Sequence, residues 1–412
     1  MGLSIWLSIP WVIDFSKVVT MPVALFVIIG LAYIPGYLNA FQVVSLLVDR
    51  QPQLKFDDPN LPVTILIAAW NEENGIYYSL SQIAKQDYSG PIKVLVVDNN
   101  STDRTTEMAY QYANELNLDL ECLFEATSGK NHALNFGLTK VETELVITLD
   151  ADTLLHPSAI RYLISRFISS PSDVCAVAGT VLVRNSRKNL LSRMQEWDYF
   201  LGIASTKRLQ GMYRSTLVAQ GAFSLYKTEV IKNLGGWPDA IGEDIVLTWK
   251  FFKQGWTVYF EPQSVAFTDV PYILKHFMKQ RSRWARGMIE GIKEVKPWEH
   301  PVLFTKFLTG IDLVIPYLDI SYTFFWLPGL VMAFFGLFYI VGPLTLFVLP
   351  LTLASNFILY LNQHRVFKKL NLHIRKNAIG FITYVLLYQM IMSPISVWGY
   401  IQEILQLRRV WR

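Results

Sequence analysis

The chain has 412 residues with a formal net charge of +4; 52% of its residues are hydrophobic and only 17% are charged. Soluble domains carry about 25% charged residues, so this composition argues against a wholly soluble protein. The mild positive charge suits an anionic membrane surface or an anionic substrate and argues against nucleic acid as a partner. Two cysteines, Cys122 and Cys175, make no disulfide framework, which is typical of a reducing compartment.

Residues 1–55 are predicted to form an N-terminal membrane region. The apolar stretch 1–13 is too short to span a bilayer and contains Pro10, so it either lies on the surface or forms a helical hairpin with the next segment. Met21–Val48 is nearly free of charge and long enough to cross a hydrocarbon core of about 30 Å.

Residues 56–270 read as an α/β domain. Short β-branched apolar runs alternate with helical patterns, which predicts a mostly parallel sheet with helices on both faces and ligands at the carboxyl ends of its strands. The segment 220–226 is expected to be a further strand with a close approach at Gly221, where the glycine either marks a bulge in a packed strand or belongs to a segment that lines an acceptor site. The other predicted strands occupy residues 63–69, 92–97, 145–149 and 174–178.

Asp98 directly follows one of these runs and is the first candidate ligand-binding residue. Its carboxylate can accept a hydrogen bond from a pyrimidine N–H, with Ala69, Asn71 and Glu72 in the facing loop. The alternative is an Asx turn that caps the following helix.

Asp150 and Asp152 follow the run 145–149. Side chains two residues apart on an extended segment share one side, so both carboxylates can face a divalent cation, Mg²⁺ or Mn²⁺, which would neutralise a diphosphate leaving group. Lys130, at an expected helix N-terminus, can reach a phosphate. The alternatives are a capping aspartate and a solvated lysine.

Glu243 and Asp244 open a predicted apolar helix, where the helix dipole favours acidic residues in any case. A sugar transfer needs one base to take a proton from the acceptor hydroxyl, because a nucleoside diphosphate leaves without protonation. Hydrolysis of a glycoside would normally need a second carboxylate as an acid. We expect Asp244 to be the base, with Glu243 beside it.

Residues 271–300 are predicted to form an interfacial amphipathic helix, since apolar residues recur at helical spacing among lysines and arginines. A more specific interpretation assigns Arg283 to a diphosphate and Trp284 to the face of an acceptor sugar. Gln280 lies one turn earlier on the same side.

Residues 301–412 are predicted to form a second membrane region, with candidate spans at 308–339, 340–361 and 378–404. The basic loop 364–376 and the basic segment 408–412 are both expected on the cytoplasmic side. One simple span between them cannot satisfy both expectations. Either Pro394 marks a re-entrant element or the last segment lies along the surface, and the number of spans stays open.

The order of these motifs resembles the signature set of the processive family-2 membrane glycosyltransferases, which include cellulose, chitin, hyaluronan and poly-N-acetylglucosamine synthases. The matching motifs, within residues 61–290, are Asp98, Asp150-x-Asp152, Glu243-Asp244 and Gln280-x-x-Arg283-Trp284.

The resemblance implies a GT-A domain embedded between transmembrane and interfacial helices, and inverting transfer from a UDP-sugar. It also assigns roles. Asp98 would read uracil, Asp150 and Asp152 would bind diphosphate and metal, and Asp244 would be the base. Gln280, Arg283 and Trp284 would line the acceptor and nucleotide site.

Within the family the chain is most similar to the poly-β-1,6-N-acetylglucosamine branch. That branch implies UDP-N-acetylglucosamine as donor, a growing biofilm polysaccharide exported through the helices, and a multi-pass inner-membrane protein with a cytoplasmic catalytic domain. A small membrane subunit and export or deacetylase proteins would be partners. Gly242, Arg281 and Arg286 depart from the branch, which usually has Thr, Leu and Gln there. The alternatives are a hyaluronan, chitin or glucan synthase, a non-processive lipid glycosyltransferase, and a membrane protein without catalysis.

Overall fold

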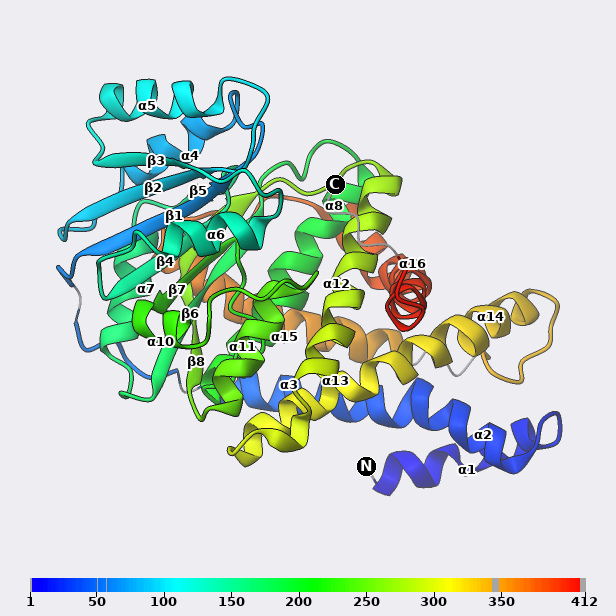
Figure 1. The fold of residues 1–412 in the computed structure, drawn as a ribbon. Helices are drawn as coiled ribbons and strands as arrows, with labels where there is room; N and C mark the ends of the chain where they lie inside the picture. Colours follow the sequence, from blue (N-terminus) through cyan, green and yellow to red (C-terminus); the bar gives the residue numbers. More distant parts are fainter. Residues whose placement is uncertain (1, 50, 57, 343–347, 408–412) are drawn as a thin grey trace.

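The computed structural model describes residues 2–49, 51–56, 58–342 and 348–407. An α/β unit with one large sheet occupies one side of the molecule, and long apolar helices extend from it on the other side (Figure 1). The sheet has eight strands in the order β3-β2-β1-β4-β7-β6-β8-β5.

The strands of the sheet alternate with helices along the chain, as predicted. Their bounds are β1 Val63–Ala69, β2 Ile92–Asp98, β3 Leu120–Phe124, β4 Leu145–Leu149, β5 Leu154–Leu155, β6 Val174–Val183, β7 Phe223–Lys227 and β8 Thr257–Thr268. β3, β2, β1 and β4 run parallel, β7 runs antiparallel to β4 and β6, and β8 runs parallel to β6. The sheet is therefore mostly parallel, and the carboxyl ends of β1, β2 and β4 meet at one edge.

Helices cover both faces of the sheet because successive strand residues point to opposite sides. In β1, Ile65 and Ile67 pack with α4 (Ile76–Ile83) and α7 (Ala159–Ile168), whereas Leu66 packs with α6 (Lys130–Leu138) and α11 (Glu243–Lys253). Two further helices complete the unit, α5 (Thr105–Leu116) and the short α10 (Thr228–Asn233).

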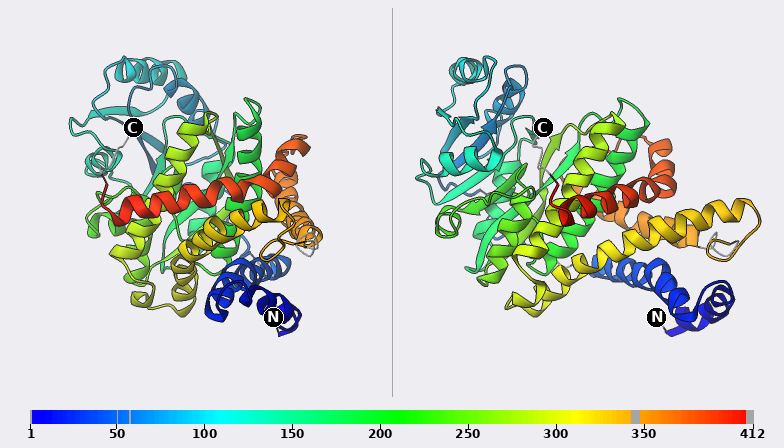
Figure 2. Two further views of the ribbon diagram at one scale, coloured as in Figure 1. Left: turned by 90° about the vertical axis from the view of Figure 1, so that its right-hand side faces the viewer. Right: turned by 45° about the vertical axis from the view of Figure 1, so that its right-hand side comes forward.

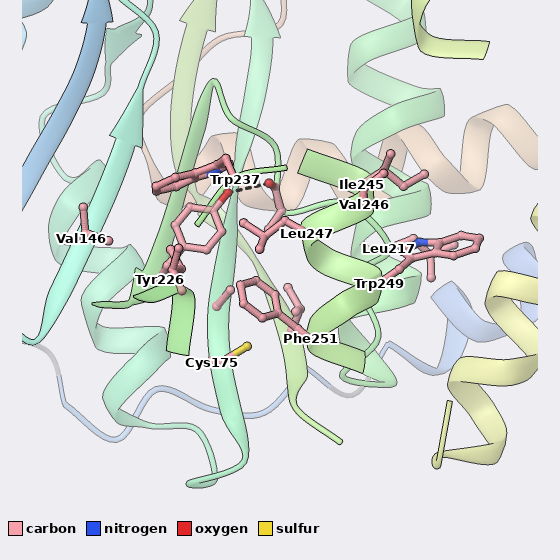
Figure 3. Close-up of a cluster of buried hydrophobic side chains, with 14 of the residues drawn as sticks. Val146, Cys175, Leu217, Tyr226, Trp237, Ile245, Val246, Leu247, Trp249 and Phe251 are labelled. Atoms are coloured by element: carbon pink, nitrogen blue, oxygen red, sulfur yellow. Dashed lines mark hydrogen bonds between the residues drawn. The ribbon is translucent and has the colours of Figure 1, made fainter. Parts of the chain in front are cut away.

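The core under α11 is rich in aromatic side chains (Figure 3). Trp249 and Phe251 of α11 are fully buried, and so is Tyr226 of β7, whose hydroxyl donates to the carbonyl of Ala219 at 2.7 Å. Removing one such aromatic ring from a core typically costs about 3–5 kcal/mol. This packing fixes the N-terminus of α11, where Glu243 and Asp244 lie.

One prediction for the sheet is wrong. The segment 220–226 is not a strand throughout, because Gly221 and Ala222 form a turn and β7 begins at Phe223. The strand signal came from the apolar residues that follow the glycine.

A long helix links the sheet to the apolar helices. It runs through α8 (Leu190–Trp197), the π-helical turn η2 (Asp198–Ile203) and α9 (Ala204–Met212). After β8 comes α12 (Leu274–Glu294), the predicted amphipathic helix, followed by the short turn η3 (Pro297–Glu299).

Near the N-terminus, α1 (Gly2–Ser16) packs against α2 (Met21–Ile28), and the helix continues through η1 (Ile29–Tyr33) and α3 (Ile34–Val48). The structure therefore shows the apolar stretch 1–13 in a helical hairpin with the next segment, which was one of the two alternatives.

The C-terminal helices differ in detail from the predicted spans. α13 (Leu303–Ser321), η4 (Tyr322–Trp326) and α14 (Leu327–Phe334) form one continuous helix, which ends before residue 339. Part of the predicted span 340–361, residues 343–347, lies outside the described residues, and α15 occupies Val348–Lys369. The basic residues 364–369 thus belong to α15 rather than to a loop. The last helix, α16, occupies Ala378–Ile404.

Candidate functional site

The candidate site begins at the edge where β1 and β2 end. Ala69 and Asp98 are neighbours in the sheet register, and the N–H of Asn99 donates to the carbonyl of Ala69 at 2.8 Å. The buried Asp98 carboxylate accepts hydrogen bonds from the Ser101 N–H at 2.9 Å and from the Thr106 hydroxyl at 2.6 Å. These contacts form the turn that leads into α5. Each carboxylate oxygen retains a further lone pair for a ligand.

The loop after β1 is joined to the loop after β2. Asn71, at φ 56°, donates its N–H to the Ser101 hydroxyl at 3.0 Å and accepts from the Thr102 N–H at 2.8 Å. The adjacent Glu72 faces other carboxyl groups. Its burial, followed by the charge of Asp152, raises the pKa of Glu72 to about 7. The structure therefore places Glu72 near the Asp150-x-Asp152 segment.

Lys130, the first residue of α6, forms an ion pair with Asp150. Burial opposes the charge on Lys130, but the carboxylates of Asp150 and Glu243 outweigh this effect and raise the pKa of the ammonium group. The lysine thus connects the end of β4 with the start of α11.

The loop before Lys130 is held by Asn99, which sequence reasoning did not single out. Asn99 Oδ1 accepts the N–H of Gly129 at 2.7 Å, and its amide donates to the carbonyl of Thr127 at 2.7 Å. Gly129 has φ 144°, a conformation that favours glycine. The run of polar residues after Asp98 was the available signal, but it does not reveal a partner 30 residues away.

The turn at Gly221 lies between Lys130 and Glu243. A Cβ built on Gly221 would lie 3.0 Å from Lys130 Nζ and 3.7 Å from Glu243 Oε1, and the carbonyl of Ala222 accepts the N–H of Asp150 at 3.2 Å. The absence of a side chain at Gly221 keeps the space between these groups free. Residues from β4, α6, α11 and this turn therefore converge on one place.

The two acids that open α11 have different surroundings. Glu243 is buried; desolvation, with the neighbouring charge of Asp244, raises the pKa of Glu243 to about 7 against the opposing effect of Lys130 and Arg283. Asp244 is only partly buried and accepts the N–H of Ile245 at 2.8 Å. Asp244 is thus the more accessible of the two carboxylates.

Helix α12 carries three predicted residues, of which Arg283 is related to the acids of α11 by its charge. Arg283 is exposed and close enough to act electrostatically on Glu243, and Trp284 is 40% exposed. Gln280 Oε1 is buried, and no residue in the described part of the chain donates a hydrogen bond to it. An exposed guanidinium and indole beside an unsatisfied amide oxygen are suited to binding a polar ligand.

The unexpected Gly242 has a structural reason. A Cβ on Gly242 would lie 2.6 Å from Gly287 Cα, so α12 packs directly against the backbone before α11. The Gly242 N–H also donates to Glu290 Oε2 at 3.0 Å. A threonine at position 242 would not fit this close approach, which sets the distance between α12 and the acids of α11.

The carboxylates of Asp150, Asp152 and Glu72 are of the kind that suits a hard divalent cation. Asp150 and Asp152 supply carboxylate oxygens, the ligand type that Mg²⁺ and Mn²⁺ prefer, with Glu72 nearby. Among the described residues, no group of three or more acidic, histidine or cysteine side chains is arranged to hold a metal by itself. The residues therefore fit a cation that also takes ligands from a bound phosphate, the usual arrangement for Mg²⁺.

The sequence and the fold together identify the protein family to which the chain belongs. Residues 59–287 match the family model described as glycosyltransferase like family 2, and because the match covers more than half of the chain, the chain belongs to that family. The sheet and its helices form a GT-A glycosyltransferase fold. A mannosyltransferase from Pyrobaculum calidifontis, solved in complex with GDP-Man and Mn²⁺, shares this fold with a TM-score of 0.57 and 19% identity; the match covers 93% of this chain and 100% of that one.

More specific likeness comes from curated relatives. The chain is 30% identical over 241 residues to the poly-beta-1,6-N-acetyl-D-glucosamine synthase of Staphylococcus aureus (strain MSSA476), covering 58% of this chain and 57% of the relative. It is also 30% identical over 226 residues to the synthase of that name from Staphylococcus epidermidis, covering 55% and 54%. The chain thus spans little more than half the length of the relatives it matches.

Proposed function

We propose that this glycosyltransferase transfers N-acetylglucosamine from UDP-N-acetylglucosamine, with inversion, to a growing β-1,6-linked polysaccharide. The observation that carries the proposal is the convergence of Lys130, Asp150 and Glu243 around Gly221, at the carboxyl edge of the sheet. The names of the curated relatives support the choice of sugar and linkage.

The donor would lie across this edge. Asp98 would accept the uracil N–H beside Ala69, and Lys130 and Arg283 would contact the diphosphate from opposite sides. Asp150 and Asp152 would hold a divalent cation, which supplies positive charge to stabilise the leaving diphosphate when it is bound. Asn71 and Glu72 would border the donor on the β1 side.

The acceptor hydroxyl would approach from the side of Asp244. Its oxygen attacks the anomeric carbon, the bond from that carbon to the diphosphate oxygen breaks, and the hydroxyl proton moves to the Asp244 carboxylate. UDP leaves with the bonding electrons. Trp284 would stack on the acceptor sugar and Gln280 would hydrogen-bond to it, while buried Glu243 keeps Lys130 in place.

We also propose a multi-pass location in the inner membrane with the GT-A unit in the cytoplasm. Met21–Val48 and Ala378–Ile404 are long and apolar enough to cross a membrane by length and composition. The helix ends next to the GT-A unit are tied to it, since Asp49 pairs with Arg208 and the Thr305 hydroxyl bonds that of Ser215 at 2.8 Å. Processive elongation with export, a small membrane subunit, and export or deacetylase partners belong to this proposal.

The test is UDP release by the purified chain in nanodiscs across a panel of UDP-sugars with Mg²⁺ or Mn²⁺, with the product sized. Turnover confined to UDP-N-acetylglucosamine, with a long product cut by a β-1,6-specific hydrolase, is the expected result. A single added sugar would replace polymerisation with lipid glycosylation. Turnover only with another donor would contradict the assigned sugar.

A further inference from the structure

Lys207 of α9 carries a positive charge that the proposed mechanism does not use. Its side chain is partly buried, and its ammonium group donates to the carbonyl of Val218 at 2.9 Å and to the side-chain oxygen of Gln220. Both acceptors are uncharged. Within the described ranges of the chain, no carboxylate forms an ion pair with Lys207, so its charge is not neutralised by direct contact.

A charged group in this position costs free energy. Moving an ammonium group out of water is unfavourable, and hydrogen bonds to neutral oxygens offset only part of that cost. Burial accordingly lowers the pKa of Lys207 to about 8, while the negative charge of Asp244 opposes this effect. The lysine therefore stays mostly charged at neutral pH, and the acid that acts on it is the expected base.

The two acceptors belong to the segment 218–221, which leads into the turn at Gly221. Gln220 joins this segment to two elements, because its side-chain oxygen accepts from Lys207 and its amide donates to the carbonyl of Gly179 in β6 at 2.6 Å. Lys207 thus orders the chain directly before the place where the candidate site residues converge.

The peptide group between Val218 and Ala219 connects Lys207 with Asp244. Its carbonyl accepts from Lys207, and its N–H donates to the hydroxyl of Thr248 at 2.9 Å. The same hydroxyl donates to the carbonyl of Asp244 at 2.7 Å. Successive hydrogen bonds of this kind polarise one another and hold their groups in one geometry. The lysine is therefore part of the network that fixes the backbone of the expected base.

The helix that carries Lys207 is itself held on two sides. α3 runs from the part of the molecule where α1 and α2 lie to the α/β unit (Figure 1, Figure 2), and there its C-cap, Asp49, pairs with Arg208. Against the sheet, a Cβ on Gly211 would lie 2.8 Å from Phe260 Cβ, so α9 packs closely on β8. α9 is therefore fixed between α3 and the sheet.

Glu243 and Asp244 are adjacent acids, and the cations around them act on them unequally. Because like charges repel, a proton that the pair takes up can lie on either carboxylate. Lys130 acts on both acids, Arg283 on Glu243 and Lys207 on Asp244. Arg283 is exposed and is assigned to the diphosphate. With the donor bound, Lys207 is therefore the cation that favours a negative charge on Asp244.

We propose that Lys207 is a positioning residue for sugar transfer, which orders the segment 218–221 and keeps the negative charge of the acid pair on Asp244. The inference rests on the proposed function, in which Asp244 takes the proton of the acceptor hydroxyl. A base must be unprotonated before the reaction, and a neighbouring cation favours that form. A proton taken up by the pair then stays on Glu243, the less accessible acid.

The test compares Lys207→Met with the unaltered chain in nanodiscs, by UDP release from UDP-N-acetylglucosamine between pH 6 and pH 9. We expect kcat to fall by at least about tenfold at the acidic end, the size expected when a neighbouring opposite charge is lost. The loss should shrink above pH 8, where the acid pair holds no proton and Lys207 of the unaltered chain loses its own charge. KM for the donor should stay the same, because Lys207 contacts no residue assigned to the donor.

The matched control is Lys232→Met on α10. The ammonium group of Lys232 also donates to a backbone carbonyl, that of Val141 at 2.8 Å, and should leave kcat unchanged at every pH. The other titratable groups that act on the acid pair are the same in both variants. They are Lys130 from α6, Arg283 from α12 and Tyr226 from β7.

A double-mutant cycle with Asp244→Asn separates this role from a structural one. In the Asp244→Asn chain the charge on which Lys207 acts is absent, so adding Lys207→Met should lower kcat little further. A structural role would instead multiply the two losses. If Lys207→Met does not fold, as judged by thermal unfolding, Lys207→Gln keeps a hydrogen-bond donor without the charge and takes its place.

Full activity of the Lys207 variant at acidic pH would overturn the inference. So would a loss that is equal at every pH and multiplies with that of Asp244→Asn. Absence of transfer by the unaltered chain with any UDP-sugar would instead contradict the proposed function, so the two failures can be told apart.

Discussion

The guanidinium carbon of Arg281 lies 4.1 Å from the centroid of the Trp284 ring, in cation–π contact. Arg281 is 2% exposed and donates to Asp198 Oδ2 at 3.0 Å, and the hydroxyl of Tyr388 donates to the same oxygen. The position of the indole is therefore set by a buried ion pair, between Arg281 and Asp198, that joins α12 to η2 and α16. This network gives a structural reason for an arginine where the family branch usually has leucine.

Replacing Arg281→Met should destabilise the fold by about 3–5 kcal/mol, because it leaves the Asp198 carboxylate buried without its partner. The double variant Arg281→Met/Asp198→Asn should regain most of that loss. Thermal unfolding in detergent measures both, and Lys279→Met, an exposed position on the same helix, is the control. A double variant no more stable than Arg281→Met alone would show that the pair is not the cause.

Asp244→Asn should lower kcat for sugar transfer by about 10²- to 10⁴-fold, the usual contribution of a general base. Binding of UDP should change little, since Asp244 is assigned to the acceptor side. UDP release and calorimetric titration with UDP separate the two effects, and Glu294→Gln, an exposed acid on α12, is the matched control. Full activity of Asp244→Asn would remove this residue from the mechanism.

Asp152→Asn should raise the concentration of Mg²⁺ or Mn²⁺ needed for half-maximal activity by at least about tenfold. Removing even a residue that only hydrogen-bonds to a metal ligand lowers metal affinity by about that factor. Chelation with EDTA should abolish turnover, and added cation should restore it. Titration of activity with each cation measures the change. Unaltered turnover in EDTA would contradict the proposed role of Asp150 and Asp152.

Gly242→Ala should destabilise the fold by about 1–3 kcal/mol, because its Cβ would press on Gly287 and force α12 away from α11. Gly310→Ala, in α13, is the control, since nothing lies within 4 Å of its Cβ and alanine favours a helix by about 0.5–1 kcal/mol. Thermal unfolding compares the two. If both variants had the same melting temperature, the contact between Gly242 and Gly287 would leave room for a methyl group.

The free energy of unfolding should depend on pH through the titration of Glu243. Because its pKa is raised from 4.5 to about 7 in the folded chain, the folded state binds the proton more tightly than the unfolded state does. Its contribution to the free energy of unfolding therefore falls as the pH rises between these values and is constant above them. Glu243→Gln should flatten this slope, as seen by thermal melts from pH 5 to 8. An unchanged slope would assign the titration to another group.

The sequence predicted the parts of the site that depend on local patterns. The bounds of β1 and β4 follow from β-branched apolar runs, and Asp98 and Asp150 lie at the strand ends that those runs imply. Partners far apart in the chain were not predictable, since nothing local relates Asp198 to Arg281 or Asn99 to Gly129. The turn at Gly221 was taken for strand because the apolar residues after it extend the β pattern toward the glycine.

We propose that the groups that converge around Gly221 bind the sugar donor. The most direct test of this proposal is a structure of the chain with UDP-N-acetylglucosamine and Mg²⁺. We expect uracil beside Asp98, the diphosphate between Lys130 and Arg283, and the anomeric carbon facing Asp244. A donor bound instead in the cavity of about 620 Å³ between α11, α12 and α16, which Lys250 and Lys293 line, would contradict the account.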